Sequence, residues 1–217
     1  MKFNFIDKSK TKSLDNVMID KNSVVLLSTD FLPTIDLDDE LTGVTNFIKS
    51  LCVKSRDFSC TILGGTTLLC KNKKYWGTLV VDQGKFLGIS DMTHPMNEDY
   101  DKSGILRVFD TSRGRLGVVS GDDICFFEIS RMMKLWECDV LIFSLNKKVS
   151  RKYKVLSEAQ AISNGVSCIL FSSSAHAYYT KKNFKSKNIL DVEVKNNDIY
   201  IEKRRPEIYS EIVKKPF

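Results

Sequence analysis

The stretch from Gly114 to Phe143, GRLGVVSGDDICFFEISRMMKLWECDVLIF, decides the fold that this sequence predicts. It opens with a strand-like apolar run at 116–119 and turns sharply at the polar residues 120–123. Residues 127–136 then repeat apolar side chains at spacings of three and four, which predicts a helix, and a second strand-like run follows. A strand that turns abruptly into a helix exposes its turn at the carboxyl end of a sheet, where helix N–H groups stabilise negative charge. The stretch therefore predicts an α/β fold with a candidate site at the turn.

The rest of the chain repeats this alternation. Residues 36–54 carry an apolar stripe from Leu37 to Leu51, with Leu41 and Val44 between them, behind acidic residues that favour a helix start. The expected helices are 36–54, 127–136 and 154–164, and the expected strands are 24–28, 60–70, 75–82, 84–90, 105–110, 115–119, 140–144 and 166–172. Without repeats or a linker, residues 1–217 are expected to form a single domain of α/β layers around a mixed sheet.

Two further local signals set expectations for the second half of the chain. In the helix predicted at 154–164, we expect Val155, Leu156, Ala159 and Ile162 to face inward, and Gly165 to end the helix. Near the C-terminus a hairpin is expected around Asn196-Asn197.

Composition excludes several classes of protein. The 217 residues are 42% hydrophobic and 28% charged, with 11 Gly and 4 Pro, which excludes disordered and collagen-like chains. No apolar run approaches the roughly 18 residues of a membrane span. The N-terminus lacks the apolar core of a signal peptide, so we expect a cytoplasmic protein without membrane contact.

Cysteines and charge limit the ligands. Six cysteines without a Cys-x-x-Cys pair, and only two histidines, predict reduced core thiols with no metal site and no cofactor. The net charge of +6 and the C-terminal lysine and arginine clusters raise the alternative of nucleic-acid binding. Interspersed carboxylates and the absence of a nucleic-acid-binding motif predict weak, nonspecific binding only.

The stretch that opens this section resembles the nitrilase, or carbon–nitrogen hydrolase, superfamily. Its pattern, G-x-x-G-v-x-x-C-x-D-x-x-F-P-E-x-x-R, is matched in register by Gly114, Gly117, Asp123, Phe126, Glu128 and Arg131. Other segments are similar to the family in the same order: Leu32-Pro33, Gly64-Gly65, Gly84-Lys85, residues 92–94, 156–164 and 204–209. The resemblance implies a four-layer α-β-β-α sandwich, here shortened at its C-terminus.

The resemblance also implies that the catalytic groups are missing. The family uses a Glu base, a Lys that helps to hold the oxyanion, and a Cys nucleophile. Their positions hold Thr34, Met92 and Gly121. None of these side chains can remove a proton at neutral pH, stabilise an oxyanion or attack a carbon. The leading hypothesis is therefore a catalytically degenerate protein with a binding, regulatory or partner role.

Other residues near the turn keep a second hypothesis open, in which the chain is an active hydrolase of amide, nitrile or ureido substrates with a relocated nucleophile. The alternative nucleophile is Cys125, although it lies about one helical turn from Gly121. Asp122 is expected to cap the helix start, and Asp123 to support the turn. With His94, Cys125 and Glu128, these carboxylates form a candidate vestigial pocket.

The helix at 127–136 predicts an interaction surface. Met132, Met133, Leu135 and Trp136 spread over a wider arc than one helix buries against its own sheet. We therefore expect a homodimer with Met132, Met133 or Trp136 at or near the contact. A small-molecule ligand or a different protein partner also remains open, and the sequence identifies neither.

Overall fold

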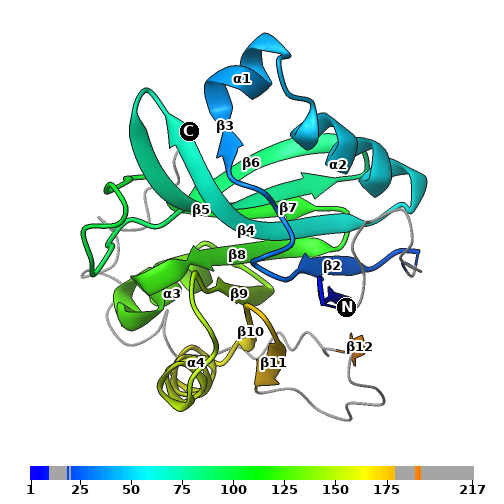
Figure 1. Ribbon diagram of the computed structural model, residues 1–217. Coiled ribbons are helices and arrows are strands. Elements are labelled where there is room, and N and C mark those ends of the chain that lie inside the picture. Colours follow the sequence, from blue (N-terminus) through cyan, green and yellow to red (C-terminus); the bar gives the residue numbers. More distant parts are fainter. Residues whose placement is uncertain (10–18, 20, 179–188, 192–217) are drawn as a thin grey trace.

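Two β-sheets pack face to face, and helices cover the outer face of each sheet (Figure 1). The computed structural model describes residues 1–9, 19, 21–178 and 189–191. One buried apolar cluster, which includes Phe3, Val80 and Ile142, lies between the sheets. A second buried apolar cluster lies between one sheet and the helices on its outer face, and a third lies between the other sheet and its helices. The predicted four-layer α-β-β-α sandwich is thereby confirmed.

The first sheet has seven strands in the order β12-β1-β2-β4-β5-β6, with β3 paired to β4. They are β1 (Lys2–Ile6), β2 (Val24–Leu27), β3 (Ile35–Asp36), β4 (Thr61–Cys70), β5 (Lys73–Asp82), β6 (Lys85–Asp91) and β12 (Ile189–Asp191). Strands β1, β2 and β4 run parallel, whereas β4, β5 and β6 are antiparallel. The sequence predicted no strand before Val24, yet β1 is central to the apolar core.

The second sheet has five strands in the order β11-β10-β9-β8-β7. They are β7 (Arg107–Thr111), β8 (Gly114–Ser120), β9 (Val140–Ser144), β10 (Ser167–Phe171) and β11 (Ala175–Tyr178). Strands β8, β9 and β10 are parallel. The 3₁₀ helix η2 (Gly121–Cys125) and α3 (Phe127–Leu135) connect β8 to β9, and α4 (Arg151–Asn164) connects β9 to β10. The mixed sheets that the sequence predicted are therefore present.

The helix predicted at 36–54 is in fact two helices, α1 (Leu37–Thr42) and α2 (Phe47–Asp57). Gly43 ends α1 because it adopts a left-handed conformation with φ of +78°. The predicted apolar stripe is broken at the same place, since Leu41 and Val44 are exposed. The acidic start was predicted correctly, because the Asp36 side chain accepts hydrogen bonds from the backbone of Asp38 and Asp39.

The expected inward face of α4 is correct for Leu156, which packs against the apolar cluster behind the second sheet, and wrong for Val155 and Ile162. Val155 is 55% exposed and Ile162 is 63% exposed, whereas polar residues on the other face are buried. Gln160 Nε2 donates to the carbonyl oxygen of Ile124 at 2.7 Å, and Asn164 Nδ2 donates to Ser130 Oγ at 3.1 Å. These bonds satisfy polar groups of η2 and α3. The amide side chains of α4 therefore hold the turn that follows β8.

Some sequence expectations lie outside the described residues. They are the hairpin around Asn196-Asn197, the segment 204–209 and the C-terminal basic clusters, although Ile189–Asp191 form β12. None of the described helices combines the length and the hydropathy needed to cross a bilayer.

Candidate functional site

The turn after β8 is an elbow at the carboxyl end of the second sheet. Strand β8 ends at Ser120, the chain enters η2 at once, and α3 follows. Gly121 adopts φ of +60°, a left-handed conformation that residues with a Cβ adopt only with strain. The sequence predicted this sharp connection and its glycine.

Met92 fills the space beside Gly121. A Cβ on Gly121 would overlap Met92 Sδ and would lie 3.1 Å from Trp76 Cδ1. Met92 and Trp76 are both buried, and the Met92 backbone N–H donates to the Trp76 carbonyl oxygen at 2.8 Å. The structure thus brings together two of the positions that the resemblance singled out, and leaves no space for a side chain at the elbow.

The backbone donor that follows Gly121 is also occupied. The Asp122 N–H lies 3.1 Å from Met92 Sδ, which is a weak acceptor. In a nucleophile elbow, the N–H that follows the nucleophile helps to hold the oxyanion. Here that group faces a thioether.

Asp123 holds the loop that follows β6. Its carboxylate accepts hydrogen bonds from the Thr93 N–H at 2.7 Å, the Thr93 hydroxyl at 2.9 Å and the His94 N–H at 2.8 Å. Burial raises the pKa of Asp123 above its usual range, and the bonds from Thr93 and His94 oppose this shift. The His94 ring stands 4.6 Å from the ring of Phe126 and is half exposed. Asp123 thus joins the elbow to the loop at Thr93 and His94.

Asp122 does not cap a helix, contrary to expectation. Its buried carboxylate pairs with Lys147 Nζ at 2.5 Å and accepts from the Met96 N–H at 3.2 Å. Burial lowers the pKa of Lys147, but the bond to Asp122 and the contact with Tyr153 outweigh it, so the pKa is raised. Lys147 follows β9, so this ion pair ties the elbow to the neighbouring connection of the same sheet.

The thiols near the elbow are not activated. Cys125 is half-buried at the end of η2, and burial raises its pKa, although Lys152 and Lys147 oppose the shift. Cys138 and Cys168 are buried behind the second sheet, and burial raises the pKa of Cys138 to about 12. Since the thiolate is the nucleophile, these shifts disfavour attack at neutral pH.

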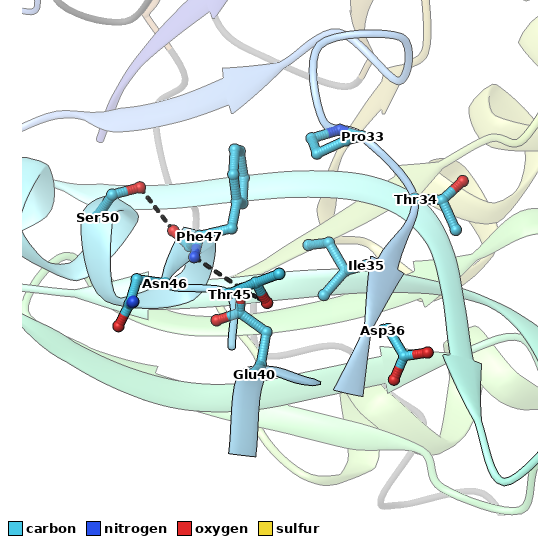
Figure 2. Close-up of a pocket in the computed structure, with 9 residues that line it drawn as sticks. All are labelled: Pro33, Thr34, Ile35, Asp36, Glu40, Thr45, Asn46, Phe47 and Ser50. Carbon is cyan, nitrogen blue, oxygen red and sulfur yellow. Dashed lines mark hydrogen bonds between the residues drawn. The ribbon is translucent and has the colours of Figure 1, made fainter. Parts of the chain in front are cut away.

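The remaining predicted residues lie outside this cluster. Glu128 is exposed on α3. Thr34 is exposed and lines a cavity of about 460 Å³ between β3, α1 and α2, whose lining includes no residue of the elbow (Figure 2). In the described part of the chain, no three His, Cys, Asp or Glu side chains are grouped so as to hold a metal ion.

Sequence reasoning missed Trp76 and Lys147 as neighbours of the elbow. Trp76 lies on β5, 45 residues before Gly121, and no local pattern indicated that its ring would reach the turn. Lys147 was one basic residue among several in a connection.

No family model matches this sequence, and no curated protein is significantly similar to it. Solved structures are similar in fold. Nit3 of Saccharomyces cerevisiae, from branch 10 of the nitrilase superfamily, has a TM-score of 0.58 and 17% identity over 76% of this chain and 65% of its own. A carbon–nitrogen hydrolase of Helicobacter pylori G27 has a TM-score of 0.53 and 16% identity over 68% of this chain and 60% of its own.

A nitrilase-superfamily amidase from Nesterenkonia sp. AN1 has a TM-score of 0.63 and 13% identity, over 87% of this chain and 83% of its own. The chain thus has the fold of the nitrilase, or carbon–nitrogen hydrolase, superfamily, as the sequence resemblance predicted. It spans less than two thirds of the length of the first two structures.

Proposed function

We propose that this chain is a catalytically degenerate carbon–nitrogen hydrolase that acts as a binding, regulatory or partner subunit. The observation that carries the proposal is the packing of Met92 against Gly121. A nucleophile at position 121 needs a Cβ, and that atom would overlap the Met92 sulfur. Thr34 and Met92 supply neither a base nor a cation in place of the family's Glu and Lys.

The environment of the elbow supports the same proposal. A reaction at this turn needs a free N–H for the developing oxyanion, and the Asp122 N–H faces Met92 Sδ. Trp76 and Met92 are buried against each other and against Gly121, so the turn is packed as a core. Catalytic groups of this kind act jointly, so the loss of all three removes most of the activity.

The alternative nucleophile is Cys125, and its position argues against that role. It lies four residues after Gly121, at the other end of the 3₁₀ helix η2, and a rise of about 2 Å per residue displaces the backbone by about 8 Å, which misplaces the sulfur from attack distance. Its raised pKa leaves little thiolate at neutral pH.

Covalent labelling tests the proposal directly. One solved amidase with this fold carries the acetamide moiety of fluoroacetamide on its active-site cysteine. We expect no such adduct on this chain in an intact-mass measurement, and no release of ammonia from amides or nitriles. A stoichiometric adduct that disappears in Cys125→Ala but persists in Cys70→Ala would establish a relocated nucleophile and refute the proposal.

We also propose that the chain forms a homodimer through the outer surface of α3 and α4. Of the three candidates Met132, Met133 and Trp136, Met133 is fully buried, so the contact falls to the half-buried Met132 or Trp136. The exposed Val155 and Ile162 on α4 support this surface, because with Ala159 they form an apolar stripe at helical spacing. A dimer in which two copies bury this apolar stripe is favoured because the stripe is removed from water.

A further inference from the structure

Two aliphatic side chains at the end of α1 are exposed to water. Among the large apolar side chains of the described residues, Leu41 and Val44 are the most exposed, at 84% and 72%. Leu41 lies in the last turn of α1, and Val44 follows Gly43, which ends the helix. The helix projects at the edge of the molecule, beyond the short strand β3 that leads into it (Figure 1). A pair of aliphatic side chains at such a place is a candidate contact surface.

The surroundings of these two side chains are acidic. Asp38 and Asp39 lie in the first turn of α1, and the helix sequence LDDELT contains no Lys or Arg. Asp38 is exposed, and its Oδ2 accepts a hydrogen bond from the Lys71 backbone N–H at 3.2 Å. We call Asp38, Asp39, Leu41 and Val44 the α1 tip. It fits a segment that combines apolar side chains with Lys or Arg.

The α1 tip is too small to hold a separate protein by itself. Complete burial of two aliphatic side chains contributes about 3–6 kcal/mol. Association of two free molecules costs about 4–15 kcal/mol in lost translational and rotational freedom, and a stable interface buries about 800 Å² on each partner. A segment of the same chain avoids most of this cost, because its tether holds it at a millimolar effective concentration. The size of the tip therefore favours a segment of this chain as the occupant.

The chain has a segment of complementary composition at 203–217, KRRPEIYSEIVKKPF. It carries five Lys or Arg against two Glu, together with five large apolar side chains: Ile208, Tyr209, Ile212, Val213 and Phe217.

The tether is long enough to reach the tip. Strand β12 ends at Asp191, beside Lys2 at the start of β1, and three strand spacings separate it from β4. The far end of β4, where Leu69 pairs with Asp36 in front of α1, is then about 30 Å away. The 11 residues between Asp191 and position 203 span up to about 36 Å when extended.

We propose that residues 203–217 dock on the α1 tip of the same chain. Apolar side chains of this segment cover Leu41 and Val44, and its basic side chains lie against Asp38 and Asp39. The elbow and the proposed dimer surface on α3 and α4 include no residue of the tip. The inference therefore goes beyond the proposed function and does not depend on it.

Limited proteolysis of the full chain tests the docking. Trypsin cleaves after Lys and Arg, and in this segment the bonds after Lys203, Arg204 and Lys214 are not followed by proline. An intact-mass time course gives the rate at which these bonds are cut. With a millimolar effective concentration and a weak intrinsic affinity, docking is expected to slow cleavage about threefold to tenfold. The protection should decrease as salt is added, because part of the contact is electrostatic.

Matched variants locate the protecting surface. Leu41→Ser with Val44→Ser removes the apolar part of the tip without changing its charge, and is expected to abolish the protection. Val155→Ser with Ile162→Ser removes an equally exposed aliphatic pair from α4 and is expected to leave the protection unchanged.

Cross-linking of the parent chain gives a second readout that needs no variant. A water-soluble carbodiimide joins a carboxylate to an amine in contact with it, so we expect peptides that link Asp38 or Asp39 to Lys203, Lys214 or Lys215 within one copy. The proposal would be overturned by equal cleavage of the parent and the Leu41→Ser/Val44→Ser variant, or by equal loss of protection in the α4 variant. Links from these lysines only to other carboxylates, or only between two copies, would also overturn it.

Discussion

The packing at Gly121 makes a quantitative prediction about stability. In Gly121→Ala, the new Cβ must adopt φ of +60°, which costs about 1–2 kcal/mol in a left-handed conformation. The same Cβ overlaps Met92 Sδ, and overpacking of a buried site costs about 1–3 kcal/mol more. We therefore expect the free energy of unfolding to fall by about 2–5 kcal/mol in total.

The structure supplies a matched control for the backbone part of this cost. Gly43 has φ of +78°, and a Cβ added there meets no atom within 4 Å. Gly43→Ala should therefore cost only the conformational strain of about 1–2 kcal/mol. The difference between the two alanine variants then measures the clash with Met92.

A double-mutant cycle with Met92→Ala completes the assay. Met92→Ala alone leaves a cavity and should cost about 2–5 kcal/mol. In that background, Gly121→Ala should cost only about 1–2 kcal/mol, a coupling of about 1–3 kcal/mol, whereas Gly43→Ala should be additive with Met92→Ala. Urea denaturation at one protein concentration measures the three single variants, the two double variants and the parent chain. If Gly121→Ala costs no more than Gly43→Ala, or is additive with Met92→Ala, then Met92 does not occupy the elbow as described.

Three other predictions follow from charge and exposure. Because the pKa of Asp123 is raised, the folded chain binds a proton on this carboxyl group more tightly than the unfolded chain does. The contribution of the Asp123 carboxyl group to stability is therefore greatest below the unfolded pKa of 3.8 and is lost as the pH rises through the folded pKa. Urea unfolding of the parent chain and Asp123→Asn should show this: the stability of the parent relative to the variant falls as the pH rises above about 4, and a flat difference would contradict it. For the dimer, sedimentation at micromolar concentration should show Ile162→Asp as a monomer and Leu41→Asp, at an exposed apolar residue of α1 beside the other sheet, as a dimer, and a monomeric parent would refute the surface. Nucleic-acid binding should be weak, nonspecific and steeply reduced by salt, so submicromolar, sequence-selective binding in a filter assay at physiological salt would contradict it.

The segments with a clear local period were predicted well. Most strands and the helices at 127–136 and 154–164 were placed to within a few residues, since a repeat of two or of three to four depends only on near neighbours in the chain. Errors arose where a turn or a polar contact outweighed the apolar period. The predicted helix at 36–54 divides at Gly43, where Glu40 turns to cap the second helix. In α4, the polar face turns inward because Gln160 and Asn164 reach polar groups of η2 and α3.

By itself, the sequence determined the order of most strands and helices, the α-β-β-α fold through its resemblance to a known family, and the residue types at positions 34, 92 and 121. Only the tertiary structure placed the Met92 thioether against Gly121 and paired Asp122 with Lys147. The physical reason is separation along the chain. Met92 lies 29 residues before Gly121, and Lys147 lies 25 residues after Asp122. No repeat of two or four relates such residues, and the packing of whole strands and loops brings them together.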